Sequence, residues 1–177
     1  ANSRKKILEA YFGETGAKYS LTRTHINSCD FSLSNYSYAP VEGDKELVNL
    51  SIKEDLNDIV PMIKDAMAIS KDGFNIISSP WTAPPWMKDN KEWVGGKLLP
   101  EYYDTWALFF SKYFDAYHNE GIDIWGITVE NEPHGNGTLT VIVRNILSTY
   151  VFCLSKSVYG EMDASKRLSF GRKVWGK

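Results

Sequence analysis

Helical and extended segments alternate at similar spacing through most of the chain, and this alternation constrains the fold more than any other feature. In the helical segments, apolar residues recur every three or four positions. The extended segments are short and either alternate with β-branched residues or are continuously apolar. The expected elements are helices over 3–12, 51–70 and 101–120, and strands over 19–26, 74–80 and 122–129. This order predicts βα units around a parallel sheet, which is an α/β fold.

Two of the helical segments carry further local signals. Ser51 and Glu54 have the spacing of a capping box, which predicts that the second helix begins there. Pro61 lies inside this segment and is expected to kink or divide the helix. The third helix carries an aromatic stripe that we expect to pack in the core. It consists of Trp106, Phe109, Phe110, Tyr113, Phe114 and Tyr117.

The composition indicates one globular domain and excludes a polyanion as the default partner. Of the 177 residues, 43 % are hydrophobic and 14 % are aromatic, which is enough to build one core. The net charge of -2 creates no field that would hold nucleic acid, so we expect no nucleic-acid partner. Cys29 and Cys153 form no C-x-x-C pair and cannot make a disulfide framework. The charged N-terminus shows no apolar stretch of a signal peptide.

The loops after the three predicted strands are the places to look for a site. In parallel sheets, ligands bind at the carboxyl ends of the strands. The three strands are followed by "NSCDFS", "SPWTAPPW" and "ENEPHGNG". We therefore expect one rim that brings together an acid, two indole rings and an amide–acid pair: Asp30, Trp81, Trp86, Asn131 and Glu132.

The amide–acid pair Asn131–Glu132 suits the cleavage of a glycosidic bond. That reaction needs an acid to protonate the leaving oxygen and a second carboxylate opposite it. Burial at a strand end beside another carboxylate raises the pKa of a glutamic acid, and Glu132 is the candidate for such a group. Asn131 is placed to hydrogen-bond the sugar 2-hydroxyl. Pro133 would fix the turn that aims the carboxyl inward.

A metal site is an alternative interpretation of the same stretch. Glu130, Glu132 and His134 occupy alternate positions, as ligands on one face of a strand would. However, His134 follows Pro133, where the alternation of a strand should end, and no second histidine cluster accompanies it. We therefore expect neither a metal nor a cofactor, and stoichiometric metal after dialysis would support the alternative.

Three motifs, "RTHINSCDFS", "SSPWTAPPWMK" and "WGITVENEP", resemble glycoside hydrolase family 30 over roughly residues 5–137. The resemblance implies a retaining glycosidase on a (β/α)8 barrel with an attached β-sandwich. Its acid/base would be the Glu of an Asn-Glu-Pro tripeptide after the fourth strand, and its nucleophile another Glu after the seventh. The fold expected here is thus α/β: residues 1–137 would form a partial TIM barrel, holding barrel strands two to four with their helices.

The resemblance also implies roles for individual residues of the rim. Glu132 would be the general acid/base, and Asn131 would bind a sugar hydroxyl next to it. Asp30, in "SCDFS", would bind hydroxyls on the far side of the glucose, and Trp81, in "SPWT", would line the same subsite.

Two further residues would support the site. Arg23 matches a strand arginine that lies under the nucleophile and keeps it ionised, and its alternative role is a buried ion pair of the barrel. Glu130 is expected to be a structural hydrogen-bonding partner.

The segment 138–177 does not continue the family pattern, and we expect a divergent tail of unknown role. It holds seven basic and two acidic residues, a balance of +5, whereas residues 1–137 hold thirteen and twenty, a balance of -7. The apolar stretch 139–154 is too short for a membrane span and contains Arg144. Three parallel strands cannot close an eight-stranded barrel, so open sheet edges are expected to favour self-association.

The resemblance implies a β-glucoside or glucosylceramide-like substrate, in carbohydrate or sphingolipid metabolism, although relatives also act on β-1,6-glucan and xylosides. Family members are usually secreted or lysosomal. Because the family's nucleophile lies beyond the matching residues, we expect this chain alone to have little or no activity. The alternative is a non-catalytic sugar-binding fragment, in which Asp30, Trp81 and Asn131 keep contact with a sugar.

Overall fold

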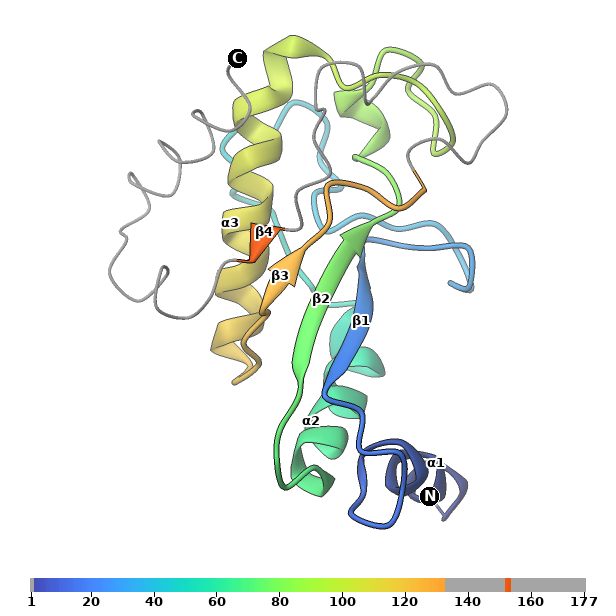
Figure 1. The fold of residues 1–177 in the computed structure, drawn as a ribbon. Helices are drawn as coiled ribbons and strands as arrows, with labels where there is room; N and C mark the ends of the chain where they lie inside the picture. Colours follow the sequence, from blue (N-terminus) through green and yellow to red (C-terminus); the bar gives the residue numbers. More distant parts are fainter. Residues whose placement is uncertain (1, 133–151, 154–177) are drawn as a thin grey trace.

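The structure, a computed structural model, describes residues 2–132 and 152–153, in which helices and strands alternate (Figure 1). The helices are α1 (Asn2–Phe12), α2 (Ile59–Ile69) and α3 (Tyr103–Asn119), and the strands are β1 (Leu21–Ile26), β2 (Asn75–Pro80), β3 (Gly126–Ile127) and β4 (Phe152–Cys153). Short 3-10 turns also occur, namely η1 (Asp55–Asn57), η2 (Pro85–Met87) and η3 (Pro100–Tyr102). The predicted order of helix and strand is confirmed for the three units.

The strands β1, β2 and β3 form a parallel sheet in chain order, and β4 pairs antiparallel with β3. β3 is much shorter than the strand predicted over 122–129. Its flanks nevertheless follow β2, because Trp125 N donates to Ile76 O at 2.8 Å and Thr128 N donates to Ser78 O at 2.9 Å. The third segment therefore runs beside β2 up to the strand's carboxyl end.

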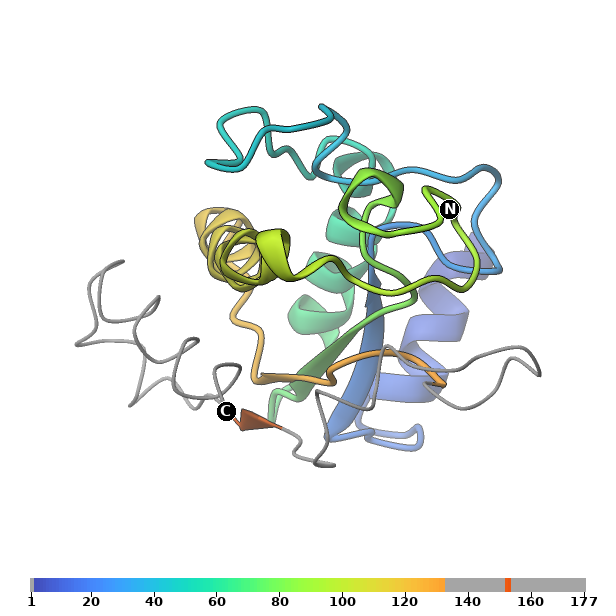
Figure 2. The same cartoon turned by 90° about the horizontal axis from the view of Figure 1, so that it is seen from above.

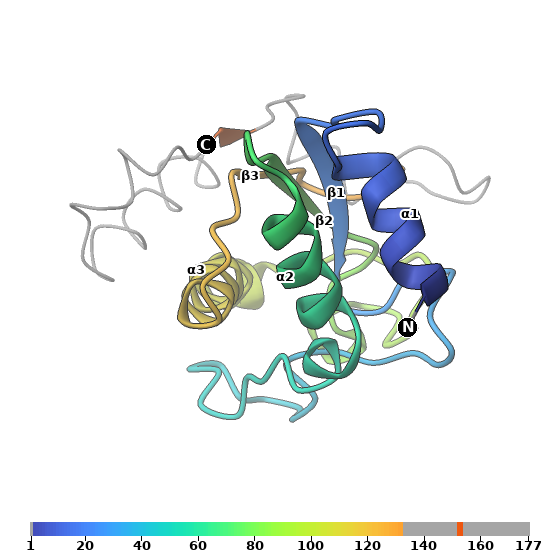
Figure 3. The ribbon, with the colours of Figure 1, turned by 90° about the horizontal axis from the view of Figure 1, so that it is seen from below.

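The helices α2 and α3 lie on the same side of the sheet, with α1 beside α2 (Figures 2 and 3). The core fills the space between them and the sheet. From the sheet it takes Ile26, Ile76 and Ile127, all buried, and from α2 it takes Val60. This is the arrangement that the α/β prediction requires, with helices packed against a parallel sheet.

The two faces of the sheet differ in their surroundings. Ser78 on β2 faces the helices, where its Oγ accepts a hydrogen bond from Tyr113 Oη at 2.8 Å. Side chains alternate between the faces along a strand, so Ile77 and Ser79 point the opposite way. In the register of the sheet, Arg23 on β1 lies beside Ile77 and shares its face. This second face, which we call the open face, carries the candidate site.

The start of α2 differs from the prediction. Ser51 Oγ accepts from Lys53 N rather than from Glu54 N, and the helix begins at Ile59, after the turn η1. The N-cap is Asp58, whose carboxylate accepts from Ile59 N at 2.7 Å. The capping box predicted at Ser51 and Glu54 is therefore wrong.

Pro61 also behaves differently from the prediction. It is the third residue of α2, which runs unbroken over Ile59–Ile69. The first amides of a helix have no partner within the helix, so a proline is tolerated in the first turn. The predicted kink is thus wrong because the helix starts later than the sequence pattern indicates.

The aromatic stripe of α3 packs in the core, as predicted, and all six of its side chains are buried. Tyr38, from the loop after β1, stacks on two of them, with ring centroids 6.0 Å from Phe109 and 5.9 Å from Tyr113. The stripe therefore binds the loop after β1 to the third unit, which helps to fix the rim of the sheet.

A fully buried carboxylate, Asp55, ties three elements together. It accepts hydrogen bonds from Tyr36 at 3.0 Å, from Tyr38 at 2.5 Å and from Tyr117 at 2.5 Å. Burial raises the pKa of Asp55, and the three tyrosine hydroxyls oppose that rise. Burying a carboxyl without hydrogen-bond donors costs free energy, and the three tyrosine hydroxyls offset that cost here.

The tail predicted over 138–177 lies outside the described residues except for the two residues of β4, which add an antiparallel strand beside β3. Pro133 and His134 lie outside them as well. Among the helices that the structure describes, none has both the length and the apolar character needed to cross a membrane.

Candidate active site

On the open face, Arg23 joins residues from all three units of the chain. Its Nε donates to Ser79 Oγ at 2.8 Å, and its Nη2 donates to Asn131 Oδ1 at 2.7 Å. The guanidinium carbon lies 4.9 Å from the ring centroid of Trp81, within the range of a cation–π contact. Three of the predicted residues, Arg23, Trp81 and Asn131, are thus brought together.

The alternative role of Arg23, a buried ion pair, does not match this geometry. Its side chain is exposed in the described part of the chain. The partners named above are a hydroxyl, an amide oxygen and an indole ring, and none of them is acidic. Arg23 therefore acts here as a donor that orients neutral side chains.

Ser79 is the buried centre of this network. Its Oγ accepts from Arg23 and also from Thr128 Oγ1 at 2.7 Å. Neither Ser79 nor Thr128 was singled out from the sequence. The register explains their meeting, because residues of β2 and the β3 segment that lie side by side share one face of the sheet.

Trp81 is fixed from a second side by His25 of β1. The two rings meet edge to face, with centroids 6.3 Å apart. His25 Nδ1 lies 2.5 Å from the carbonyl oxygen of Asn27. Because a carbonyl oxygen can only accept, Nδ1 must carry the proton. The indole is therefore held between a guanidinium and an oriented imidazole.

Asn131 and Glu132 follow β3, where the chain passes the carboxyl end of β2. Asn131 N donates to Pro80 O at 2.7 Å, which fixes the backbone at the carboxyl end of β2. Glu132 then adopts a φ of 42°. Its side chain is exposed and lines an open hollow on the open face. The other residues that line this hollow are Leu21, Thr22, Arg23, Ile77, Thr128, Glu130 and Asn131.

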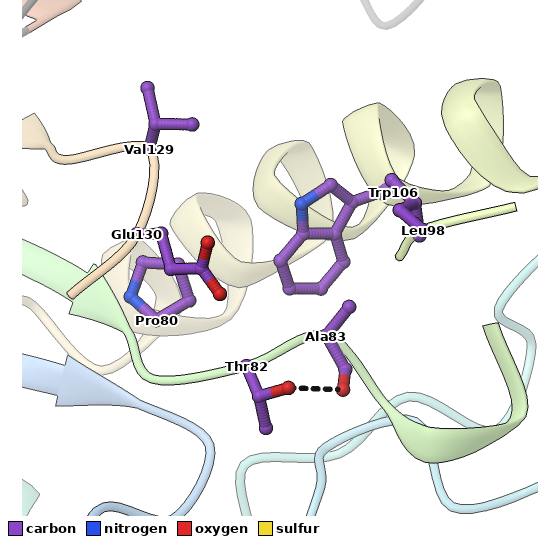
Figure 4. A pocket seen from close by; sticks show the side chains of 7 residues that line it. All are labelled: Pro80, Thr82, Ala83, Leu98, Trp106, Val129 and Glu130. Carbon is purple, nitrogen blue, oxygen red and sulfur yellow. Dashed lines mark hydrogen bonds between the residues drawn. The ribbon is translucent and has the colours of Figure 1, made fainter. Parts of the chain in front are cut away.

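Glu130, and not Glu132, is the buried carboxyl of this stretch. This corrects the expectation that Glu132 would be buried. Burial raises the pKa of Glu130 to about 7, and the Lys88 ammonium opposes that rise. The carboxyl of Glu130 points into a small pocket beside Thr82 and Trp106 (Figure 4). Glu132 lies past the sheet, where the described part of the chain offers little to cover it.

Two of the predicted rim residues do not join the cluster. Asp30 is exposed in the bend after β1, and its carboxylate makes no hydrogen bond or ion pair within the described residues. Trp86 is buried in the core, where its Nε1 donates to Ala39 O at 2.9 Å. The prediction that Trp86 lies on the rim is therefore wrong, because the turn η2 points it toward Tyr102 of η3 and the loop after β1.

The residues of the proposed metal site are not gathered around a common point. Within residues 2–132 and 152–153, no three His, Cys, Asp or Glu side chains lie close enough to hold a metal ion. Glu130 points into the pocket beside Trp106, and His134 lies outside the described residues.

Lys88 is the ionisable residue of this region that sequence reasoning missed. It is fully buried, and its Nζ donates to Thr82 Oγ1 at 2.7 Å and to Gly95 O at 2.9 Å. Burial lowers the pKa of Lys88 to about 8, and the Glu130 carboxylate opposes that fall. The available signal was its place in "PPWMKD", where a lysine directly follows an apolar turn.

Comparison with known proteins agrees with this geometry. The model of the glycosyl hydrolase family 30 TIM-barrel domain matches residues 1–151. The lysosomal acid glucosylceramidase of Mus musculus is 37 % identical over 137 residues, which cover 74 % of this chain and 27 % of the mouse protein. The chain thus spans about a quarter of the length of that relative.

Two solved structures are similar to this chain both in fold and in sequence. SrfJ from Salmonella typhimurium superposes with a TM-score of 0.72 at 34 % identity, covering 77 % of this chain and 31 % of SrfJ. The endo-β1,6-glucanase BT3312 gives a TM-score of 0.66 at 34 % identity, covering 73 % of this chain and 30 % of that enzyme. The three parallel strands and their helices are therefore part of an α/β barrel, and the chain belongs to glycosyl hydrolase family 30.

Proposed function

We propose that this chain carries the acid/base half of a retaining β-glycosidase of the glucosylceramidase type. The observation that supports it is the cluster of Arg23, Trp81 and Asn131 on the open face, next to Glu132 at the carboxyl end of β2. An aromatic ring, an oriented amide and a carboxyl at one rim are the groups that binding and cleaving a glycoside require.

Glu132 is the proposed general acid/base. In a retaining mechanism it protonates the leaving oxygen while a second carboxylate attacks the sugar, and it then removes a proton from the incoming water. Its exposed side chain lines the open hollow, so a glycosidic oxygen there is within reach. This assignment is the one that the Asn-Glu-Pro motif implies by resemblance.

Asn131 is the proposed ligand of the sugar 2-hydroxyl, and Arg23 sets its orientation. A guanidinium has donors only, so the group of Asn131 that faces Arg23 must be the amide oxygen. The amide nitrogen then keeps both of its hydrogens for a ligand. Such a contact strengthens as the transition state develops.

The proposed substrate is a β-glucosyl group, of the kind that a glucosylceramide carries. The similarity to lysosomal acid glucosylceramidase supports this choice. A β-1,6-linked glucan is the second candidate, because the solved structure at a TM-score of 0.66 is an endo-β1,6-glucanase. Asp30 and Trp81 are the proposed contacts on the glucose, and Glu130 supports the site from behind.

The polypeptide of 177 residues is proposed to bind sugar without turning it over efficiently. Retention requires two carboxyls about 5 to 5.5 Å apart. By resemblance, the nucleophile comes from a strand beyond those that match here. The same chain would then act as a sugar-binding part, with catalysis left to a complete barrel.

Calorimetry with a glucose-configured iminosugar tests the proposal directly. We expect binding by the unmodified chain and weaker binding by Trp81→Ala and Asn131→Ala. Glu132→Gln should also weaken it, because the ligand's ammonium loses an anionic partner. Asp72→Asn is the matched control for loss of a carboxylate, since Asp72 is exposed in the turn before β2, at the other end of that strand.

Two results would refute the proposal. Equal binding by all four variants would show that the cluster does not hold the sugar. Efficient hydrolysis of an aryl β-glucoside by the purified chain, abolished by Glu132→Gln, would refute the proposed inactivity. Comparing a β-1,6-linked disaccharide with an alkyl β-glucoside in the same calorimeter distinguishes the two candidate substrates.

A further inference from the structure

A buried ammonium lies directly behind the proposed site. Lys88 is fully buried, and the hydrogen-bond acceptors of its Nζ are the hydroxyl of Thr82 and the carbonyl of Gly95. Both acceptors are neutral. A buried charge with neutral acceptors alone is costly, and removing the opposite charge near such a group is more damaging than removing both.

Glu130 supplies the opposite charge. Among the acidic groups that act on Lys88, Glu130 has the largest effect, ahead of Asp89 and Glu92, which are exposed on the following loop. Thr82, which holds the Lys88 ammonium, also lines the pocket into which the Glu130 carboxyl points (Figure 4). The two groups are not in direct contact but lie on either side of Thr82, beside a pocket that Trp106 and Leu98 also line.

The backbone of Glu130 belongs to the turn that carries the proposed catalytic groups. Its carbonyl oxygen lies 3.3 Å from Thr128 Oγ1, and the next residue is tied to Pro80 O through its amide. The side chain of Asn131 is held from the open face by Arg23. Consecutive side chains are thus held from opposite sides, Glu130 from the interior and Asn131 from the open face.

We propose that Lys88 and Glu130 form a buried pair of opposite charges, coupled across Thr82, that positions the Asn131–Glu132 turn from behind, while Arg23 holds it from the front. Both members are positioning residues, because Lys88 is fully buried and Glu130, although it borders the open hollow, points its carboxyl into the pocket beside Trp106 (Figure 4). That the pair supports catalysis rests on the proposed function. The coupling of the two charges does not depend on that function.

A double-variant cycle with a spectroscopic signature tests the pair. The variants are Lys88→Met, Glu130→Gln and the two combined, compared at a pH of about 7.5, between the pKa of about 7 of Glu130 and that of about 8 of Lys88, where each group is more often charged than neutral. The signature is the exchange with water of the Arg23 Nε hydrogen, which is bonded to Ser79 Oγ and is protected only while the cluster on the open face is intact.

We expect each single variant to speed this exchange about tenfold or more, because it leaves one charge buried alone. The combined variant should return the exchange to within about threefold of the unmodified chain, since no buried charge then lacks a partner. A merely space-filling role predicts that the two single effects add instead. Additive effects, or no change in either single variant, would overturn the proposal.

A second measurement covers single variants that fail to fold. The combined variant must still give a cooperative thermal transition, because replacing both members of a buried pair is tolerated where replacing one is not. Loss of folding in the combined variant would overturn the proposal. Lys91 and Glu42, 2.9 Å apart and exposed, give the matched control, for which Lys91→Met and Glu42→Gln should leave the exchange unchanged. None of these measurements uses a sugar, so they remain valid if the chain binds none.

Discussion

Arg23 and Asn131, which are 108 positions apart in the chain, are joined by a hydrogen bond of 2.7 Å. The bond connects the first parallel strand to the residue next to the proposed acid/base. It turns the amide of Asn131 so that its nitrogen is free for a ligand. The orientation of a proposed sugar-binding group in the third unit is thus set by a strand of the first.

The Arg23 guanidinium, which reaches both Ser79 and Asn131, should therefore be needed for full sugar binding. Arg23→Lys keeps the charge but cannot reach Ser79 and Asn131 together. We expect about tenfold weaker binding of a glucose-configured iminosugar, from loss of one charge-assisted hydrogen bond. Calorimetry measures this effect. Arg4→Lys, in an exposed ion pair with Asp65 on the helices, should bind as the unmodified chain does.

Glu130 should make the stability of the chain depend on pH. Burial raises its pKa from 4.5 to about 7, so the folded state keeps the proton over a range where the unfolded state has lost it. The stability that this group contributes is complete below pH 4.5 and is lost as the pH rises through about 7. The loss is at most about 3 to 4 kcal/mol.

Urea unfolding at several pH values checks this prediction. Glu130→Gln should remove the part of the pH dependence between 4.5 and about 7. Glu132→Gln, a change to an exposed carboxylate two positions away, should leave that part in place. A pH profile that is the same in Glu130→Gln as in the unmodified chain would contradict the assignment.

The cluster around Asp55 should contribute strongly to stability. Tyr117→Phe removes a hydrogen bond to a buried carboxylate and should lower the free energy of unfolding by about 1.5 to 3 kcal/mol. Chemical denaturation measures the change. Tyr11→Phe, at a half-exposed position on α1, is the control and should change it by less than about 0.5 kcal/mol.

The start of α2 gives a local test of the corrected N-cap. Asp58→Ala should destabilise the chain by about 1 kcal/mol, because it removes the side-chain acceptor of the Ile59 amide. Ser51→Ala should have a small effect in the same denaturation experiment. Equal losses for both variants would restore the capping box that the structure does not show.

The free edge of β1 should favour self-association. In the part of the chain that the structure describes, β1 pairs only with β2, and Leu21 at its start is 52 % exposed. Unpaired strand edges recruit further strands. Sedimentation velocity should show larger species as concentration rises, and Thr22→Pro should reduce them. A monodisperse monomer with a sharp cooperative melt would contradict this expectation.

The elements that could be predicted from the sequence are those with strong periodicity. The aromatic stripe of α3 fits the buried face of a helix, and the continuous apolar run of β2 fits a buried strand. The cluster of Arg23, Trp81 and Asn131 followed from motifs at strand ends, because a parallel sheet places such ends on one rim. These parts depend on local pattern and on topology.

The remaining features depend on contacts between distant segments. Ser51 and Asp58 are both good N-caps, and Asp55, buried among three tyrosines, holds the turn η1 that precedes the helix. Alternation alone places Glu130 and Glu132 on the same face. Lys88, more than forty positions earlier, contributes the charge that goes with a buried Glu130. No pattern within one segment contains that information.

At Glu132, the backbone conformation that is best for stability and the side chain that the proposed chemistry needs favour different residues. Its φ of 42° lies in the left-handed region, which glycine adopts freely and which costs a residue with a side chain free energy. Glu132→Gly would relieve that cost and delete the proposed acid in one step. A chain selected for stability alone would thus tend to lose its carboxyl here, and keeping Glu132 means tolerating a locally less favourable backbone.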